Sequence, residues 1–426
     1  MTITRLVGYQ VLDSRGRPTV AATVLLSDGT SHTSHIPSGA STGLHEAKEL
    51  RDHKTPYSEK IFNGKSVFQA CANINELIAP KLVGNVANLV AADQLIKTID
   101  PSEDFHTIGA NASLAVSIAV AKSQAHTEGK SLARFFQPTG PLQLPMPMVN
   151  ILSGGAHAKK TMDIQDVLVM AHGATSFREA ISWISAIREI ATTEGAKLGA
   201  PTHLIADEGG LAIPFTTIES ACDFVSSCIT LAGLEVGRDV SIALDVAATQ
   251  LYIDGLYHLP NANKVHTKND FIAYMQNLVK NQPIISIEDP FAEDDWDSWN
   301  QFMTGIPTNL QVVGDDLYTT NLVRLNRGIL HNSSNSILIK PNQNGLLTTT
   351  LQVLKEAKAS NLRTVVSARS GETEDSWLAD LAVGWGAGQI KVGSTHGSDR
   401  TSKWNRLLEL EAIEDCEFNK GQPLKS

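Results

Sequence analysis

The chain has 426 residues, of which 42% are hydrophobic and 19% charged, and its formal net charge is −10. This ordinary globular composition excludes collagen, a coiled coil and a largely disordered chain, and without a basic excess we expect no nucleic-acid partner. The four cysteines form no CxxC pair, which argues against a zinc site or a disulfide scaffold. No apolar run reaches the roughly 18 residues of a membrane span, and the start lacks the apolar core of a signal peptide. We therefore expect a cytoplasmic protein with no membrane span.

The N-terminal part of the chain predicts a small α+β unit. Apolar and polar residues alternate around 19–26, and Ser27-Asp28-Gly29 forms a turn signal, which together predict an antiparallel hairpin or meander. From Glu46 to Phe136 apolar residues recur at three- and four-residue steps, the pattern of helices. Strands followed by helices are typical of an α+β domain.

A proline- and glycine-rich break at 137–141 marks the predicted domain boundary. It divides the chain into an N-terminal capping domain, residues 1–138, and a C-terminal domain, residues 139–426, that carries the active site. The capping domain includes the segment 36–46, rich in small residues, which predicts a mobile lid that reaches an anion or a metal. The alternative for this segment is a plain surface loop.

The C-terminal domain repeats a pattern of short apolar runs, each followed by a charged or polar group and separated by helix-like stretches. Continuous apolar strands fit a parallel sheet covered on both faces, and seven to eight strand–helix units fit a (β/α)8 barrel. A doubly wound open sheet is the alternative, but no GxGxxG motif follows any of these runs. The predicted strands are 203–210, 241–247, 283–290, 311–317, 336–342, 363–371 and 388–394.

Charged residues end the predicted strands, where a barrel places its active site. One aspartate after a strand is usually a helix N-cap. Lysines that end apolar runs are different, because a partly buried cation must be paired or functional. The strand-end set is Glu208, Asp245, Glu288, Asp315, Lys340, Arg369 and Lys391.

Three of these carboxylates predict a metal site. Asp245, Glu288 and Asp315 are hard oxygen donors, which suit magnesium, whereas zinc prefers histidine or cysteine. A neighbouring lysine acts as a general base if nearby positive charge lowers its pKa. Both Lys340 and Lys391 are candidates on this argument.

A second small-residue loop, 151–161, precedes Gln165 and Asp166. Taken alone, His157 in this loop is best interpreted as a solvent-facing residue.

Several uncommon motifs resemble the enolases, the phosphopyruvate hydratases. They occur in the family's order between about residues 8 and 410 and include DSRGRPTV (13–20), PSGASTG (37–43), SIEDPFAEDDW (286–296) and ARSGETED (368–375). The resemblance implies an enolase-like (β/α)8 barrel with an N-terminal α+β capping domain. It also implies a lysine base working with magnesium, a pairing for which this superfamily is the general example.

Individual roles follow from the resemblance, residue by residue. It implies that Asp245, Glu288 and Asp315 bind the first Mg²⁺ and that Ser41 binds a second. Lys340 is then the base that removes the C2 proton, and Glu208 is the acid that assists loss of the C3 hydroxyl. Two further catalytic positions are Asp166, on the leaving-group side, and His157, in an active-site loop. The substrate-binding positions are Arg369 and Ser370 on the phosphate, Lys391 on the carboxylate, and Gln165 in an active-site loop.

The implied activity is the magnesium-dependent dehydration of 2-phosphoglycerate, or a close analogue, to phosphoenolpyruvate, a glycolytic reaction. The implied partners are a small phosphorylated or phosphonate substrate and a second copy of the chain, in a homodimer or higher homo-oligomer.

The chain departs from the family's pattern at several positions. Asp166 stands where the family has glutamate, and Ala368 where it has histidine. Ser153 replaces an asparagine, and Ala21 and Thr23 replace glutamates in a region that contributes to the family's dimer interface. Pro341 and Asn344 alter the stretch after Lys340.

These departures leave two alternatives open. One is a paralogue that dehydrates a bulkier phosphonate or phosphoester analogue, and the other is a non-catalytic enolase-like binding protein. The second is disfavoured because the metal carboxylates Asp245, Glu288 and Asp315 and the lysine Lys340 are all present.

Overall fold

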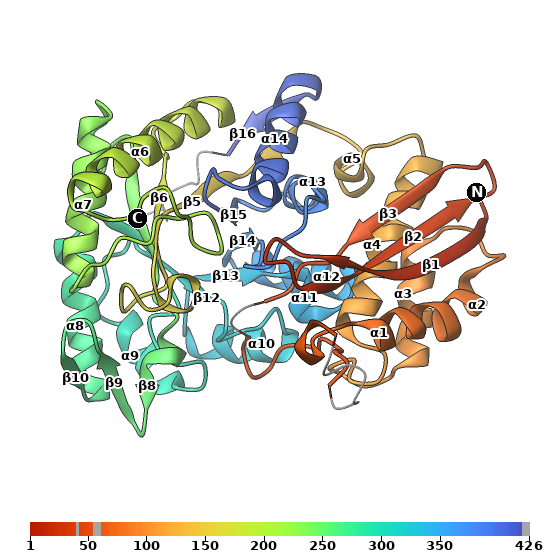
Figure 1. The fold of residues 1–426 in the computed structure, drawn as a ribbon, viewed down its shortest axis with the longest axis horizontal. Helices are drawn as coiled ribbons and strands as arrows, with labels where there is room; N and C mark the ends of the chain where they lie inside the picture. The colour runs from red at the N-terminus through yellow and green to blue at the C-terminus, as the bar shows by residue number, and fades with distance from the viewer. Residues whose placement is uncertain (40–41, 54–60, 420–426) are drawn as a thin grey trace.

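The computed structural model describes residues 1–39, 42–53 and 61–419. An N-terminal unit, red and orange in Figure 1, lies beside a barrel formed by the rest of the chain. The predicted class, an α+β domain with a β/α barrel, is confirmed. Among the described helices, none combines the length and the apolar character needed to cross a membrane. The domain division at residue 138 stays a prediction.

The N-terminal sheet is an antiparallel meander, as the alternating pattern predicts. Its strands are β1 (Ile3–Leu12), β2 (Pro18–Leu26) and β3 (Ser31–His35), hydrogen-bonded in that order. Gly29, in the turn after β2, has a φ of +86°, which glycine adopts without a Cβ clash. The long helix α4 (Ala110–Thr127) packs on this sheet, and Ser34 Oγ of β3 donates to the Ala115 carbonyl of α4 at 2.6 Å.

The helices of this unit begin later than predicted. The described residues 46–53 form turns and loop, because their amides are used elsewhere: Ala47 N donates to Gln343 O at 2.9 Å and Lys48 N to Asp104 O at 2.7 Å. The regular elements besides α4 are a 3₁₀ turn (Phe62–Gly64), α1 (Phe68–Asn73), a π-helical turn (Ile74–Ile78), α2 (Ala79–Leu82), α3 (Leu89–Ile99) and α5 (Leu132–Phe136).

Within the described residues, eight strands close into a barrel. One strand, β6, runs antiparallel to both of its neighbours. No crossover helix separates it from β5; a short loop with a single 3₁₀ turn (Gly155–Ala158) reverses the chain instead. In order around the barrel the strands are β5 (Met146–Ser153), β6 (Asp166–Met170), β7 (Ser241–Asp245), β11 (Ile284–Glu288), β12 (Gln311–Gly314), β13 (Ser336–Ile339), β14 (Arg363–Ser367) and β15 (Gln389–Gly393), which pairs with β5.

One predicted barrel strand is wrong. The segment 203–210 is a loop, and its apolar residues Leu204 and Ile205 are 59% and 49% exposed. The first two strands of the barrel are instead β5 and β6, which the sequence pattern missed. Pro147 lies inside β5, and an internal proline normally argues against a central strand because it donates no ladder hydrogen bond.

Helices surround the barrel (Figure 1). Its strands contribute a separate cluster of buried apolar side chains that includes Met148, Leu168, Val313 and Leu338. Smaller strands lie outside the barrel: β4 (Leu142–Leu144) pairs with β16 (Cys416–Phe418), and β8 (Tyr252–Ile253), β9 (Leu256–Leu259) and β10 (Lys264–His266) form a meander. The helices are α6 (Phe177–Lys197), α7 (Ile218–Leu231), α8 (Lys268–Asn281), α9 (Trp296–Met303), α10 (Leu322–His331), α11 (Pro341–Asn344), α12 (Leu347–Ala359), α13 (Trp377–Gly384) and α14 (Ser398–Ile413), with a 3₁₀ turn at Ala248–Leu251.

Candidate active site

The predicted strand-end charges gather at one rim of the barrel. Asp245 and Glu288 are the last residues of β7 and β11, and Lys391 lies within β15. Its ammonium donates to Asp245 Oδ2 at 2.6 Å and to Glu288 Oε2 at 2.8 Å, and all three side chains are buried. Burial, together with the charge of Asp245, raises the pKa of Glu288 well above its usual range. One ammonium therefore does not fully neutralise this pair of carboxylates.

A second ion pair joins the next two strands. Lys340, directly after β13, donates through Nζ to Asp315 Oδ2, and Gln343 Nε2 donates to Asp315 Oδ1 at 2.9 Å. Burial alone lowers the pKa of Lys340, but the charge of Asp315 outweighs it and raises that pKa. Lys340 therefore holds its proton while it is paired with Asp315.

Two further carboxylates adjoin Asp315. Asp289 accepts the Asp315 amide at 2.9 Å and the Asp316 amide at 2.8 Å, and carboxylate oxygens of all three lie within 4.8 Å of one another. Burial raises the pKa of both Asp289 and Asp316 well above normal. One ammonium, that of Lys340, pairs with Asp315, which leaves three neighbouring carboxylates short of positive charge. Carboxylate oxygens are the ligands that a hard divalent cation prefers, so these residues fit magnesium.

The side of the rim formed by β5 and β6 carries an imidazole between two carboxylates. His157 Nδ1 lies 3.0 Å from Asp166 Oδ2, and His157 Nε2 lies 3.6 Å from Glu208 Oε1. The ring is buried, so the interpretation of His157 as a solvent-facing residue is wrong. Further donors orient both acids: Ser153 Oγ donates to Asp166 Oδ1 at 2.6 Å, and Asn150 Nδ2 donates to Glu208 Oε2 at 3.0 Å.

The charges of this cluster keep the proton on the imidazole. Burial lowers the pKa of His157, but Glu208 and Asp166 more than offset it and raise the pKa to about 9. Burial raises the pKa of Glu208, but His157 and then Arg400 outweigh it and lower the pKa to about 2. Asp166, which is fully buried, has its pKa raised chiefly by burial. Glu208 is therefore ionised beside a protonated His157.

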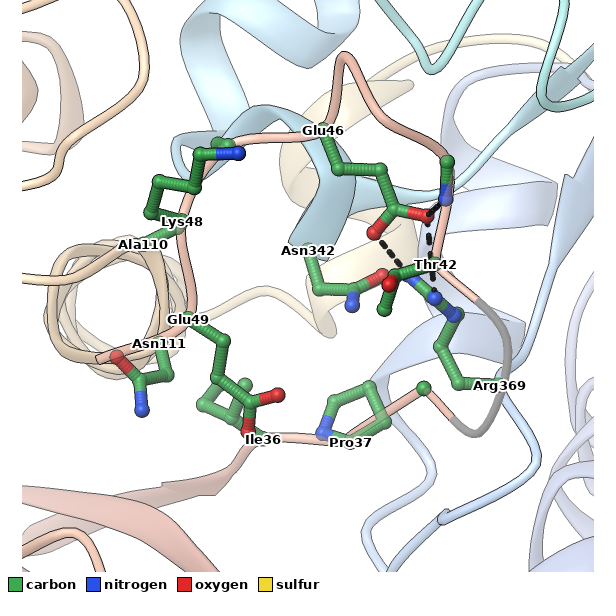
Figure 2. A pocket seen from close by; sticks show the side chains of 13 residues that line it. Ile36, Pro37, Thr42, Glu46, Lys48, Glu49, Ala110, Asn111, Asn342 and Arg369 are labelled. Carbon is green, nitrogen blue, oxygen red and sulfur yellow. Dashed lines mark hydrogen bonds and ion pairs between the residues drawn. The ribbon is translucent and has the colours of Figure 1, made fainter. Parts of the chain in front are cut away.

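Arg369 follows β14 and pairs with a carboxylate that sequence reasoning missed. Its Nη1 donates to Glu46 Oε2 at 2.8 Å and its Nη2 to Glu46 Oε1 at 3.2 Å, as Figure 2 shows. Burial lowers the pKa of Arg369, but the charge of Glu46 raises it above normal. A cavity of about 240 Å³ borders this pair and is lined also by Thr42, Lys48 and Asn342. The N-terminal unit and the barrel therefore meet at the predicted phosphate contact.

Two other predicted substrate contacts lie at the same rim. Ser370 Oγ accepts Arg15 Nη1 at 3.4 Å, so a second arginine, from the N-terminal unit, lies beside it. Gln165 Nε2 donates to Asp245 Oδ2 at 3.0 Å and its Oε1 accepts Gln250 Nε2 at 3.3 Å. Ser41, the predicted ligand of the second magnesium, lies outside the described residues.

Comparison with known proteins identifies the family to which this fold belongs. Residues 3–136 match the family model "Enolase, N-terminal domain", and residues 141–422 match "Enolase, C-terminal TIM barrel domain". The chain is 41% identical over 415 residues to the protein named "Enolase" of Helicobacter pylori (strain HPAG1), covering 96% of this chain and 96% of that relative.

The chain belongs to the enolase family. It is accordingly an enzyme of the lyase class, as the motif resemblance implied.

The departures from the enolase pattern have local structural partners. Asp166, shorter than glutamate, has both oxygens engaged, by Ser153 and by His157. Ala368 is buried at the end of β14, where its amide donates to Lys391 O at 2.8 Å. Thr23 Oγ1 hydrogen-bonds with Thr33 Oγ1 at 2.7 Å within the sheet, beside the fully buried Ala21. Pro341 is the first residue of α11, and Asn344 Nδ2 donates to Thr320 O at 3.1 Å.

Proposed function

We propose that this enolase-family protein dehydrates 2-phosphoglycerate to phosphoenolpyruvate in a magnesium-dependent reaction. The observation that supports this most is the placement of groups around the barrel. Lys340 follows β13, whereas Asp166 begins β6, and three described strands separate β13 from β6 in either direction. A base on one side and an acid cluster on the other suit an elimination in which a proton and a hydroxyl leave from opposite faces of a substrate.

The two arcs between these positions differ in charge. The arc of β7, β11 and β12 ends in Asp245, Glu288 and Asp315, which would hold Mg²⁺. In the opposite arc, of β14, β15 and β5, Arg369 follows β14 and Lys391 lies within β15. A bound magnesium ion would stabilise the negative charge that develops on the substrate carboxylate as the C2 proton leaves. A second ion held with Ser41 is part of the same proposal.

The base in this proposal is Lys340. It must be neutral to accept the C2 proton, and the charge of Asp315, followed by that of Glu288, keeps its pKa high. Burial, Arg369 and Lys391 all lower the pKa of Lys340, so loss of the Asp315 pair removes the largest effect that opposes them.

The acid in this proposal is the Glu208–His157 pair. Because His157 holds the proton, we assign the proton for the departing hydroxyl to the pair and not to Glu208 alone. Asp166 and Ser153 fix the ring so that Nε2 faces Glu208. A β-hydroxyl is a poor leaving group, and a positioned proton donor typically accelerates such a step by about 10²–10⁴-fold.

Arg369 and Ser370 would bind the substrate phosphate, and Lys391 and Gln165 the carboxylate end beside Asp245. Lys391 Nζ and Gln165 Nε2 both already donate to Asp245 Oδ2, which puts a cation and an amide where the carboxylate would meet magnesium. A cytoplasmic location, a glycolytic role and a homodimer or higher oligomer stay predictions from the family resemblance.

One alternative is a paralogue that acts on a bulkier phosphonate or phosphoester analogue, and a specific observation favours it. Ala368 and Asp166 both carry shorter side chains than the family pattern. The test uses wild-type protein with magnesium and two kinds of substrate, 2-phosphoglycerate and analogues enlarged at C3. Formation of phosphoenolpyruvate, or of the corresponding product of each analogue, is followed by ultraviolet absorbance. The proposal expects 2-phosphoglycerate to react with a kcat of about 1–10³ s⁻¹. An enlarged analogue that reacts while 2-phosphoglycerate does not would establish the paralogue instead.

A further inference from the structure

Helix α14 carries two fully buried cations, Arg400 and Lys403. A buried cation is costly unless its donors are satisfied, so their partners indicate what the cations stabilise. Lys403 Nζ lies 2.9 Å from Glu372 Oε2, and Glu372 Oε1 accepts the Arg369 amide at 3.1 Å. The helix is thus linked to the segment that carries the predicted phosphate contact.

The guanidinium of Arg400 donates hydrogen bonds to four backbone carbonyls. Its Nη1 donates to Arg369 O at 2.6 Å and to Val392 O at 2.9 Å. Its Nη2 donates to Ser370 O at 2.5 Å and to Asp207 O at 3.3 Å. These carbonyls belong to three segments: the loop after β14, the strand β15, and the loop that carries Glu208.

The backbone beside Arg400 is closely packed at the end of β15. A Cβ added to Gly393 would lie 2.7 Å from Glu208 O and 3.0 Å from Arg400 Cδ, and the residue has a φ of +113°. Only glycine suits both the conformation and the contact. The next amide, Ser394 N, donates to Glu208 O at 2.8 Å. The Glu208 loop is therefore clamped between the end of β15 and the Arg400 side chain.

We propose that Arg400 is a positioning residue that sets Glu208 relative to Arg369 and Ser370. The inference rests on the proposed function, because it assigns Arg400 the task of holding the acid side at a fixed distance from the phosphate side. None of its four carbonyl acceptors belongs to Lys340 or to the carboxylates Asp245, Glu288 and Asp315. Loss of the Arg400 contacts should therefore disturb departure of the hydroxyl more than removal of the C2 proton.

The experiment compares R400M and R400K with the control variant R406M. Arg406 lies on the same helix and pairs with Asp380 at 3.0 and 2.8 Å, away from the rim loops. For each folded variant, checked by circular dichroism, we would measure two rates at saturating 2-phosphoglycerate and magnesium. One is formation of phosphoenolpyruvate, and the other is exchange of the C2 proton with deuterium from the solvent.

We expect R400M to form product about 10–100-fold more slowly than wild type, because a misplacement near 1 Å costs about that much. Its exchange rate should stay within about threefold, its KM should rise, and R400K should recover part of the product rate. R406M should change neither rate by more than about twofold. Equal losses of both rates in R400M, or a product rate like that of R406M, would overturn the proposal.

If R400M does not fold, the proposal is tested by the two rates of R400K, compared with those of wild type and R406M. A chain that also fails to fold with lysine at position 400 would assign Arg400 to the fold and contradict the positioning role. A wild-type protein that shows neither exchange nor product would instead refute the proposed function, which separates the two failures.

Discussion

Asp166 and Asp245 are direct partners across the β6–β7 pair, the first residue of one strand opposite the last residue of the other. This pairing exists because β6 runs antiparallel to β7. In an all-parallel barrel the start of a strand lies at the face opposite to the active site. Reversal of β6 therefore brings the Asp166–His157 pair to the rim that holds the metal carboxylates.

Replacement of Glu288 by glutamine tests the metal assignment. The variant keeps the side-chain length and the Lys391 contact but removes a charged ligand, so we expect activity to fall by at least about 100-fold. Magnesium should raise the unfolding temperature of the wild type more than that of the variant, because a ligand stabilises only the state that binds it. Glu409→Gln, on the exposed part of α14, serves as control.

Two results would contradict the metal assignment. A wild-type protein with full activity after exhaustive chelation would refute it, and so would a strict preference for zinc over magnesium.

Lengthening Asp166 to glutamate tests whether the acid side is built around the shorter residue. Both Asp166 oxygens are engaged, and one added methylene moves the carboxylate by about 1.5 Å. We expect Asp166→Glu to lower the dehydration rate by about 100-fold. Removing the Ser153 hydroxyl in the same chain should make room and recover part of that loss. If the single variant matches wild type, the Ser153–Asp166–His157 arrangement has no role in positioning the proton donor.

The pKa of His157 predicts a pH-dependent stability. It rises from 6.5 to about 9 because the neighbouring charges of Glu208, Asp166 and Asp245 outweigh burial. The protonated ring therefore stabilises the folded protein fully below about pH 6.5, and this contribution disappears as the pH rises through about 9. It amounts to on the order of 3 kcal/mol.

The measurement is the unfolding temperature of wild type and His157→Gln at pH 6 and at pH 9.5. We expect the wild type to be more stable at pH 6 and the difference to shrink at the higher pH. His203→Gln, an exposed change in the neighbouring loop, controls for loss of a histidine. A difference that grows with pH would contradict the assignment of the proton to His157.

The sequence predicted much of the barrel for a physical reason. Runs such as 241–247 and 336–342 are apolar because their strands are covered on both faces, and a charge marks the rim where each strand ends. The same rule failed at 203–210, where Leu204 and Ile205 are exposed loop residues. Glu208 was therefore identified correctly as a rim residue but placed on the wrong kind of element.

Partners that join distant segments could not be predicted from the sequence. Glu46 meets Arg369 across 323 residues, and Arg400 reaches Asp207 across 193. Neither pair leaves a periodic pattern or a spacing signal, because only the closed barrel and its capping unit bring the two segments together. The role of Ser153 could be inferred only once the structure was known. The change from asparagine to Ser153 then proves to accompany the change from glutamate to the shorter Asp166.

The central claim is that Lys340 removes the C2 proton on one side of the barrel and the Glu208–His157 pair releases the hydroxyl on the other. The most direct test follows exchange of the C2 proton with solvent deuterium, together with product formation, in Lys340→Ala and Glu208→Gln. Lys355→Ala, on the exposed face of α12, is the control. We predict that Lys340→Ala abolishes both processes, whereas Glu208→Gln keeps exchange and loses product. Exchange at the wild-type rate in Lys340→Ala would contradict the account and move the base to Lys391 or another residue.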